Sequence, residues 1–409
     1  MSHLAFLSWI EDQHASMLET VLQWSHINCG SENLDGLEKM ATVLKDAFMT
    51  TGGEVSLLPS KPMTVVDEFG IPKQVPLGQV LRVTKRPDAN RQILLCGHMD
   101  TVFSQESPFQ SCTDIGDGMI QGPGVTDMKG GLNVMLTALR AFEMSPHKDQ
   151  IGWEVLINAD EEIGSFGSRH YLVDSATRAD IGLVYEPSLP DGTLAGPRKG
   201  SGNFTLVLKG RAAHAGREHH LGRNAIAALS RAVIAIDALT GGRPELTINI
   251  GRIDGGGALN VVPDLAICRF NVRVKEPEDQ MWLQNALEEI VDHANSEDGY
   301  TAKLHGGFSR PPKPMTPSLQ QLFDLLKICG TELDIPIQYK PTGGCCDGNN
   351  LAAAGLPNID TLGVRGANIH SDKEYIITQS LTERAKLTAL ILHKLASGDA
   401  SFPIKGEIR

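Results

Sequence analysis

The sequence predicts an α/β protein in which a smaller α+β unit is inserted into a larger unit. Three observations favour this architecture. Short apolar runs alternate with helix-like segments over the first 200 residues or so, as in a mostly parallel sheet covered by helices. Between residues 199 and 309 the order becomes β-α-β-β-α-β, which is typical of a two-layer unit with an antiparallel sheet. A length of 409 residues also indicates more than one hydrophobic core.

The elements of the larger unit follow from apolar spacing. Leu4 to Trp24 and Asn33 to Met49 show helical spacing, and two glycines at 52 and 53 end the second segment. A further helix is predicted over Leu132 to Phe142. Four short apolar runs are predicted strands: 80–83, 93–96, 155–157 and 181–184.

The inserted unit, residues 199–309, has its own pattern. Its predicted strands are 204–208, 246–253, 267–274 and 301–308, and its predicted helices are 225–239 and 281–294. RPPKP, from Arg310 to Pro314, is interpreted as the hinge that leads out of it. Strand and helix alternation returns over 319–397. We therefore expect a split larger unit made of residues 1–198 and 310–409.

Composition excludes some classes of protein. The formal net charge of −12 disfavours nucleic acid and anionic membranes as partners, because both are bound through clustered Lys and Arg. The first residues contain neither a basic segment nor a sustained apolar stretch, so we expect no signal peptide and no membrane span. The seven cysteines lack metal-finger spacing and are expected to be reduced thiols in a cytoplasmic protein.

Acidic and imidazole side chains follow the predicted strands. The segments are GHMDTV with His98, NADEEIGSFGS with Glu161 and Glu162, YEP with Glu186, and NIHSDKEY with His370, whose loop follows the apolar run Ile359 to Leu362. Each motif is weak alone, because a single His or acid usually lies on a solvated loop. However, the carboxyl ends of parallel strands meet at one edge of a sheet, where ligands bind. The sequence therefore predicts that these side chains converge.

Two further acids belong to this constellation. Asp127, in GPGVTDMKGG, precedes a glycine-rich turn and a helix start that should lie at the same edge. Imidazole and carboxylate ligands suit Zn²⁺, and also Mn²⁺ or Co²⁺. A shared carboxylate can bridge two cations roughly 3.5–4 Å apart. Asp100 is expected to accept the second ring N–H of His98 and to fix its tautomer.

On these motifs the chain resembles the M20 metallopeptidases along nearly its whole length. The resemblance implies a zinc-exopeptidase-like catalytic domain with an inserted lid and dimerisation domain, and two Zn²⁺ per subunit. It also implies that His98, Asp127 and Glu186 bind one cation, and that Asp127, Glu162 and His370 bind the other. Glu161 matches the general base, and a cis peptide is expected between Asp127 and Met128.

The resemblance extends to the substrate. His214, in GRAAHAG, matches a histidine that reaches the partner subunit's active site, which implies a homodimer joined through the lid. Asn260 in GALNVVPD and Arg273 in FNVRV match substrate contacts, and a guanidinium suits a terminal carboxylate. Gly344 lies in a loop that borders the substrate pocket in the family. The sequence departs from the glycine-rich family pattern there, at Cys345 and Cys346.

Several functions remain open at this point. The first is a metallo-exopeptidase or amidase that acts on a small peptide and releases an amino acid with a free α-carboxylate, as glutamate carboxypeptidases do. The alternative is an N-acyl amino acid deacylase of the acetylornithine deacetylase type. Cys345 as a nucleophile is a lesser alternative, because no His is seen to pair with it. A noncatalytic binding protein is disfavoured because Glu161 and all five ligands are present.

Overall fold

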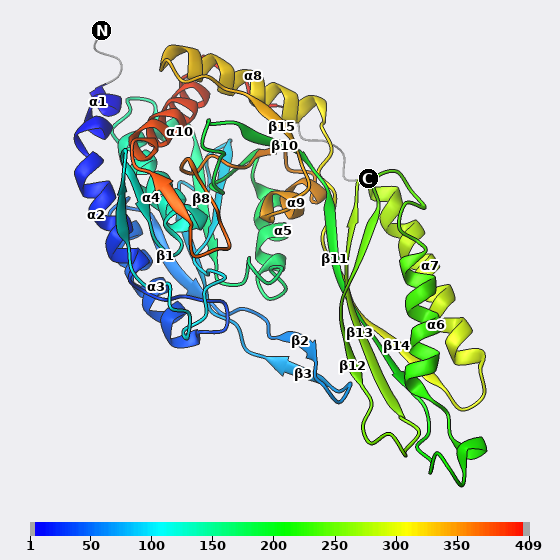
Figure 1. Ribbon diagram of the computed structural model, residues 1–409. Coiled ribbons are helices and arrows are strands. Elements are labelled where there is room, and N and C mark those ends of the chain that lie inside the picture. Colours follow the sequence, from blue (N-terminus) through cyan, green and yellow to red (C-terminus); the bar gives the residue numbers. More distant parts are fainter. Residues whose placement is uncertain (1–4, 404–409) are drawn as a thin grey trace.

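The computed structural model describes residues 5–403 and has the predicted α/β architecture (Figure 1). A broad body carries the main sheet, and a narrower unit of strands and two helices projects from it (Figure 1). The main sheet has six strands, in the order β1 (Glu54–Leu58), β4 (Val80–Lys85), β8 (Gly152–Asn158), β5 (Gln92–His98), β9 (Ile181–Val184) and β16 (Asn358–Ile359).

The predicted parallel sheet is confirmed for four of these strands. β8, β5, β9 and β16 pair in parallel. β4 is the exception, because it pairs antiparallel with β8 and with the edge strand β1. The carboxyl ends of the four parallel strands therefore point to one edge, as the argument for the site requires.

Helices cover both faces of this sheet. Six lie on one side: α1 (Ala5–Asp12), α2 (His14–Ser25), α3 (Leu34–Met49), α4 (Gly130–Phe142), α8 (Pro317–Glu332) and α10 (Ser380–Ser397). The other side carries α5 (Arg169–Arg178) and α9 (Asp347–Ala353). The helix predicted over Leu4 to Trp24 is two helices that meet at Gln13, and Leu4 lies outside the described residues.

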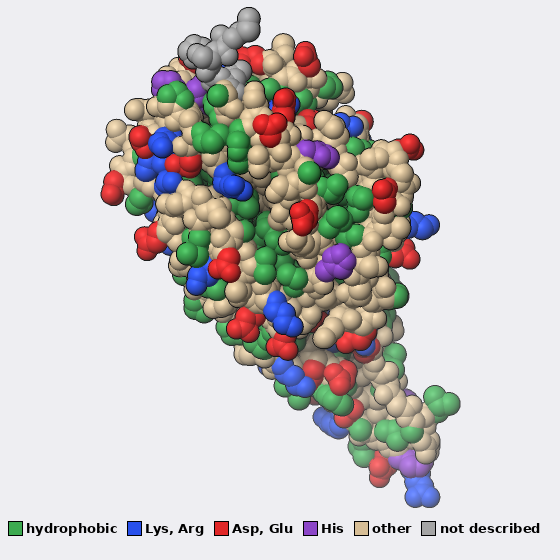
Figure 2. Space-filling model, turned by 90° about the vertical axis from the view of Figure 1, so that its left-hand side faces the viewer, with side chains coloured by type: hydrophobic (Ala, Val, Ile, Leu, Met, Phe, Trp, Pro, Cys, Tyr) green, Lys and Arg blue, Asp and Glu red, His purple; other side chains and the backbone are tan. Residues whose placement is uncertain are grey.

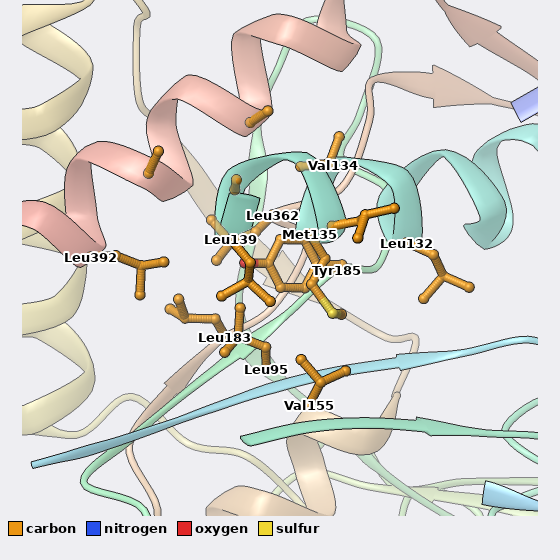
Figure 3. Packing of buried hydrophobic residues seen from close by; sticks show 14 of the residues in the cluster. Leu95, Leu132, Val134, Met135, Leu139, Val155, Leu183, Tyr185, Leu362 and Leu392 are labelled. Atoms are coloured by element: carbon orange, nitrogen blue, oxygen red, sulfur yellow. The ribbon is translucent and has the colours of Figure 1, made fainter. Parts of the chain in front are cut away.

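Apolar spacing explains why α4 is the central helix. Leu132, Met135 and Leu139 lie along it at helical intervals, and every residue of α4 except Arg140 is buried. They pack over Leu95 and Leu183 of the sheet (Figure 3). This packing fixes the start of α4, and with it the preceding turn that carries Asp127.

The inserted unit has the predicted order of elements: β11 (Gly200–Lys209), α6 (Ala225–Asp237), β12 (Thr247–Gly255), β13 (Leu265–Val274), α7 (Pro277–Ser296) and β14 (Thr301–Arg310). Its sheet is antiparallel with strand order β12-β13-β11-β14, and α6 and α7 cover one face (Figure 1). β14 continues two residues beyond the predicted strand and ends at Arg310.

The two segments of chain that connect the larger unit to the inserted unit are hydrogen-bonded to each other. Arg198 and Lys313 exchange both backbone hydrogen bonds at 2.9 Å. Their side chains meet the same buried carboxylate, because Arg198 donates to both oxygens of Asp360 at 2.8 Å and Lys313 donates to one at 2.7 Å. The segment predicted as a hinge, Arg310 to Pro314, is therefore held to the other connecting segment at Lys313.

Smaller sheets complete the body. β2 (Met63–Val66) and β3 (Pro72–Val75) form a hairpin that reaches the inserted sheet (Figure 1), where Nη2 of Arg269 donates to the carbonyl oxygens of Val66 and Asp67 at 3.0 and 3.1 Å. β10 (Leu194–Arg198) pairs with β15 (Tyr339–Thr342). A four-stranded sheet joins β6 (Thr113–Gly116), β7 (Met119–Gln121), β17 (Gly366–Ala367) and β18 (Tyr375–Ile377).

The surface agrees with the mixed composition. Acidic and basic side chains lie interspersed over the face drawn in Figure 2. No helix within residues 5–403 is both long and apolar enough to cross a membrane. All seven cysteines are free thiols. The cytoplasmic location stays a prediction.

Candidate metal centre

The strand ends bring the predicted acids and imidazoles to one edge of the sheet. His98 is the last residue of β5, Glu161 and Glu162 follow β8, and Glu186 follows β9. Asp127 lies in a π-helical turn, Val125–Lys129, directly before α4. The peptide between Asp127 and Met128 is cis, as expected from the family. His370 comes from the loop between β17 and β18.

Asp127 lies between the two imidazoles. Its Oδ1 is 3.1 Å from Nε2 of His98, and its Oδ2 is 3.3 Å from Nε2 of His370. Each imidazole also faces a second carboxylate: Glu186 is 3.8 Å from His98, and Glu162 is 3.2 Å from His370. All five predicted ligands therefore come together, in two sets that share Asp127.

The donor set fits divalent cations. Ligand atoms of His98, Glu161 and Glu186 lie within 4.8 Å of one another, and so do those of His98, Asp127 and Glu162. These compact groups differ from the two sets that share Asp127, in which each imidazole nitrogen contacts two carboxylates. The contacts of single atoms define the two sets, because a cation binds through individual ligand atoms. Oε1 of Glu162 is buried without a hydrogen-bond partner among the described residues, as a free ligand atom would be.

Asp100 holds the loop that follows β8. Its two carboxylate oxygens accept the backbone N–H groups of Glu161 and Glu162, each at 3.1 Å, and Oδ2 also accepts from Ser31. The nearest partner of Nδ1 of His98 is the backbone oxygen of Asp100 at 2.9 Å, whereas the carboxylate is 3.5 Å away. Asp100, which was expected to orient His98, does so mainly through its backbone carbonyl group. Its carboxylate positions Glu161 and Glu162 instead.

Glu374 supports Asp127 and was not singled out by the sequence analysis. Its buried carboxylate accepts the backbone N–H groups of Gly124, Thr126 and Asp127, at 3.2, 2.8 and 2.9 Å. Glu374 precedes β18, only four residues after His370. One short segment therefore supplies a predicted ligand and fixes the turn that carries another.

Arg310 is the other residue that the sequence analysis missed as part of the site. Only 3% of its surface is exposed. Its guanidinium pairs with Glu161 at 2.8 Å and with the buried Asp347 at 3.2 Å. It also donates to the carbonyl oxygen of Gly164 and to Oγ of Ser165. The last residue of the inserted sheet is therefore bound to the predicted general base.

Burial and mutual contacts shift the pKa values in the cluster. Burial raises the pKa of Glu161 well above its ordinary value, although Arg310 opposes the shift. Burial and the charge of Asp127 raise the pKa of Glu162 to about 7. Hydrogen bonds to Asp127 and Glu162 raise the pKa of His370 to about 11. Burial disfavours the imidazolium of His98, but its carboxylate contacts outweigh burial and raise its pKa. A concentration of titrating groups in one cleft is typical of a functional site.

A pocket of about 300 Å³ opens over this cluster. Five predicted residues line it, namely Asp127, Glu161, Glu162, Glu186 and His370. The pocket continues to the predicted substrate loop, where Gly344, Cys345 and Cys346 line it. The Cys345 thiol contacts an arginine and has no histidine contact among the described residues, so its surroundings do not favour a nucleophilic role.

Arg273 is brought to the same loop. It is half-buried on β13, its Nη1 donates to Sγ of Cys345 at 3.0 Å, and its Nε donates to Asn271. Within residues 5–403 its guanidinium has no ion-pair partner. A cation without a counter-charge beside a pocket suits an anionic substrate group.

His214 and Asn260 lie together on the inserted unit. The two segments form a β-bridge between His214 and Val261, and the carbonyl oxygen of Asn260 accepts the N–H of Ala215 at 2.9 Å. Both side chains are exposed. Nδ1 of His214 accepts the backbone N–H groups of Gly216 and Arg217, so its contacts lie within the inserted unit. The structure thus brings these two residues together on an outer loop.

Comparisons with known proteins give the family of the chain. The description "Peptidase family M20/M25/M40" matches residues 94–394. The chain is 27% identical to carboxypeptidase G2 of Pseudomonas sp. (strain RS-16), over 95% of this chain and 91% of that one. It is 28% identical to succinyl-diaminopimelate desuccinylase of Hahella chejuensis, over 78% and 87% of the two chains.

A solved structure shares the fold. A dinuclear metal-binding peptidase of the M20 family from Bacillus subtilis superposes with a TM-score of 0.63 at 14% identity, and the match covers 95% of this chain and 99% of that one. The family match spans most of the chain and includes the segment from β5 to α10 that carries all five clustered acids and imidazoles. The chain therefore belongs to peptidase family M20/M25/M40 and is a hydrolase of that family.

Proposed function

We propose that this hydrolase is a two-metal exopeptidase or amidase that releases an amino acid with a free α-carboxylate, glutamate being the first candidate. The observation that carries the proposal is the position of Asp127, whose two oxygens face the imidazoles of His98 and His370. Such a shared carboxylate suits a pair of cations. We assign His98, Asp127 and Glu186 to one cation, and Asp127, Glu162 and His370 to the other.

The donor set suits zinc, with Co²⁺ or Mn²⁺ as alternatives. When bound, divalent cations lower the pKa of water and polarise the carbonyl oxygen of the scissile bond. We assign the proton transfer to Glu161, which lines the pocket and has a ligand atom within 4.8 Å of those of His98 and Glu186. Its carboxylate takes the proton of the attacking water and returns it to the leaving nitrogen.

The neighbours of Glu161 support this role. Asp100 fixes its backbone N–H, and Arg310 binds both its carbonyl oxygen and Oε1. Because one carboxylate oxygen is held, the side chain is restricted to a narrow range of orientations. General base catalysis depends on such placement, because the base must lie within hydrogen-bond reach of the proton that it removes.

Arg273 is proposed to bind the free α-carboxylate, with Asn260 as a further substrate contact. A guanidinium binds a carboxylate through two parallel hydrogen bonds. The unpaired charge of Arg273, its contact with Cys345 and the position of Cys345 on the pocket support this assignment. The similarity to carboxypeptidase G2 over nearly the whole chain supports the hypothesis that the protein is a carboxypeptidase.

A homodimer is proposed to complete the site. His214 is exposed, and its ring contacts stay within the inserted unit, so it is available to another subunit. The partner subunit's His214 would donate to the oxyanion that develops on the scissile carbonyl oxygen. Dimerisation through the inserted unit would bring it there.

The second candidate is an N-acyl amino acid deacylase, which the similarity to succinyl-diaminopimelate desuccinylase favours. The test is to assay metal-loaded protein on two sets of compounds, C-terminal glutamyl peptides and N-acetyl or N-succinyl amino acids. The Glu161→Gln variant serves as the control for contaminating activity. Turnover of the glutamyl set alone supports the first candidate, and turnover of the N-acyl set alone replaces it with the second. A protein that binds metal and hydrolyses neither set contradicts both.

A further inference from the structure

A buried carboxylate joins both ends of the loop that carries the proposed general base. Asp347, at the start of α9, is only 1% exposed. Its Oδ2 accepts the side-chain N–H of Asn158 at 2.6 Å, and its Oδ1 accepts the hydroxyl of Ser165 at 2.6 Å. Asn158 ends β8 and Ser165 lies beyond Glu161 in the following loop. The segment that carries the proposed base is therefore held at both of its ends.

The same carboxylate contacts the arginine that binds the base. Oδ1 of Asp347 is 3.2 Å from Nη1 of Arg310, and Nη2 of this arginine donates to Glu161 at 2.8 Å. Nη2 also donates to Oγ of Ser165 at 2.9 Å. Asp347, Ser165 and Arg310 thus contact one another in pairs, and a polar network that is satisfied in this way is rigid.

Arg310 needs a fixed counter-charge, because a buried guanidinium without an anion is strongly unfavourable. Within residues 5–403 its ion-pair partners are Glu161 and Asp347. Asp347 does not take part in the proposed proton transfer. It can therefore hold the guanidinium in place while Glu161 accepts and returns a proton.

The turn that carries Asp347 is also bonded to both segments that connect the two units. Asn349, whose side chain is buried, donates to the carbonyl oxygen of Lys199 at 3.0 Å and to that of Pro311 at 2.7 Å. Its Oδ1 accepts the N–H of Cys346 at 3.1 Å, which fixes the start of α9. The position of Asp347 is thus set where the inserted unit joins the larger unit.

We propose that Asp347 is a positioning residue for Glu161, on which it acts through Arg310 and through the two ends of the loop. The inference rests on the proposed function, because it takes Glu161 as the group that transfers the proton. The pocket lining, as far as residues 5–403 form it, does not include Asp347. Its loss should therefore slow the chemical step and leave substrate affinity largely intact.

Asp347→Asn tests this role, because the amide has nearly the same shape and lacks the charge. In Zn²⁺-loaded protein we expect kcat for a C-terminal glutamyl peptide to fall by roughly 10–100-fold, since a small displacement of a catalytic group is costly. KM and the metal content should change little. Steady-state kinetics at a temperature at which the variant is folded give both parameters.

A merely structural role predicts a different result. Glu143→Gln is the matched control, because it removes a carboxylate that is paired with Arg86 and Lys85 away from the site. Both variants should melt at a lower temperature than the wild type, but Glu143→Gln should keep the wild-type kcat. If Asp347→Asn also keeps the wild-type kcat, Asp347 acts on stability alone and the inference is overturned.

Ser165→Ala takes the place of Asp347→Asn if that variant does not fold. It preserves the pair of Asp347 with Arg310 and removes the hydroxyl that is bonded to both. We expect kcat to fall about fivefold, the effect of one ordinary hydrogen bond, with little change in KM. An unchanged kcat would then overturn the inference.

A double-mutant cycle with Arg310→Gln tests whether the two residues act on one group. Members of one network are not additive, so the double variant should lose much less activity than the product of the two single losses. Losses that multiply in full would mean that Asp347 acts independently of Arg310, which contradicts the proposed role.

Glu161→Gln separates this inference from the function on which it rests. We expect this variant to lose nearly all turnover. If it does so while Asp347→Asn keeps the wild-type kcat, the positioning role alone fails. If Glu161→Gln itself keeps the wild-type kcat, the proposed function fails, because Glu161 is then not the base.

Discussion

Nη2 of Arg310 donates to Oε1 of Glu161 over 2.8 Å and to the backbone oxygen of the same glutamate over 3.0 Å. Arg310 is the last residue of β14, and Glu161 follows β8 of the main sheet. The inserted sheet therefore contacts the proposed general base directly. Asp347, at the start of α9, holds the other side of the guanidinium at 3.2 Å.

Arg310→Gln should lower kcat while KM changes little, because Glu161 loses the group that orients it. Breaking a buried pair also costs on the order of 3–5 kcal/mol of stability, so the melting temperature should fall. Arg86→Gln is the control: it breaks the pair of Arg86 with Glu143, away from the site, at 2.6 Å. Steady-state kinetics at a temperature where both variants are folded give the result. Equal kcat in the two variants would mean that Arg310 acts on stability alone.

Arg273→Ala should raise KM steeply for substrates with a free α-carboxylate. An amidated analogue lacks the anion, so the same substitution should change its kinetics little. The loss of a charge-assisted bidentate contact is expected to cost roughly 2–3 kcal/mol, about 30–150-fold in kcat/KM. Arg252→Ala, on the exposed face of β12, is the control. An equal loss on the amidated analogue would argue against a role in carboxylate binding.

His214→Ala should lower kcat without changing the metal content, because the imidazole is proposed to act on the oxyanion. Removal of one such donor costs about 10²–10³ in kcat. His219→Ala, in the same exposed loop, should keep normal activity. A mixture of His214→Ala and Glu161→Gln subunits should regain up to about a quarter of wild-type activity, because half of randomly mixed dimers contain one intact site. No recovery in subunits shown to exchange would exclude a site shared between them.

Glu374→Gln should weaken metal binding, because an amide supplies one acceptor oxygen where the carboxylate supplies two for three backbone N–H groups. Groups that hold a ligand in place are typically worth 10–100-fold in metal affinity. Competition with a chromophoric chelator measures the change. Glu154→Gln, which breaks ion pairs on the surface of β8, should keep the wild-type affinity. Unchanged affinity in Glu374→Gln would contradict the supporting role.

Metal binding should release protons from the ligands, and the share that comes from Glu162 should fall as pH rises. In the metal-free protein the pKa of His370 is raised to about 11 and that of Glu162 to about 7. A cation needs neutral imidazoles and ionised carboxylates, so protons leave His370, His98 and part of Glu162. Between pH 6 and 8 the share from Glu162 should fall by about 0.8 proton, because its carboxyl ionises over that range without metal. Calorimetry in buffers of different ionisation enthalpy counts these protons. At pH 6, where most metal-bound water keeps its proton, a count near zero would contradict the assignment.

The convergence of His98, Glu162 and Glu186 could be predicted because each ends or follows an apolar run, and parallel strands end at one edge. Asp127 was instead predicted from the start of a helix, and His370 lies in a loop of a separate small sheet. His98 and Glu186 illustrate this, since each lies at or just beyond the end of a buried strand. Arg310 could not be predicted in the same way. RPPKP was interpreted as a hinge. The contact of Arg310 with Glu161 depends on how the inserted unit is placed against the larger unit, and the sequence pattern of neither unit gives that placement.

Glu374 was missed for a different reason. Its partners are backbone N–H groups of residues 124, 126 and 127, and backbone groups give no signal in the sequence. The helix break at Gln13 was also missed, because apolar spacing continues across it. The roles of Asn260, Gly344 and His214 rest on the family resemblance and stay predictions, since a lone chain without substrate does not test them.

The β2–β3 hairpin is another contact between the two parts of the molecule, in addition to the two covalent crossings and the contacts of Arg310. Arg269 of β13 donates hydrogen bonds to Val66 and Asp67 of this hairpin. Arg273 lies four residues further along the same strand. Any rotation of the inserted sheet that repositions Arg273 must therefore move the hairpin as well or break two hydrogen bonds. A loop remote from the metals would thus set how easily the carboxylate anchor can reach its substrate.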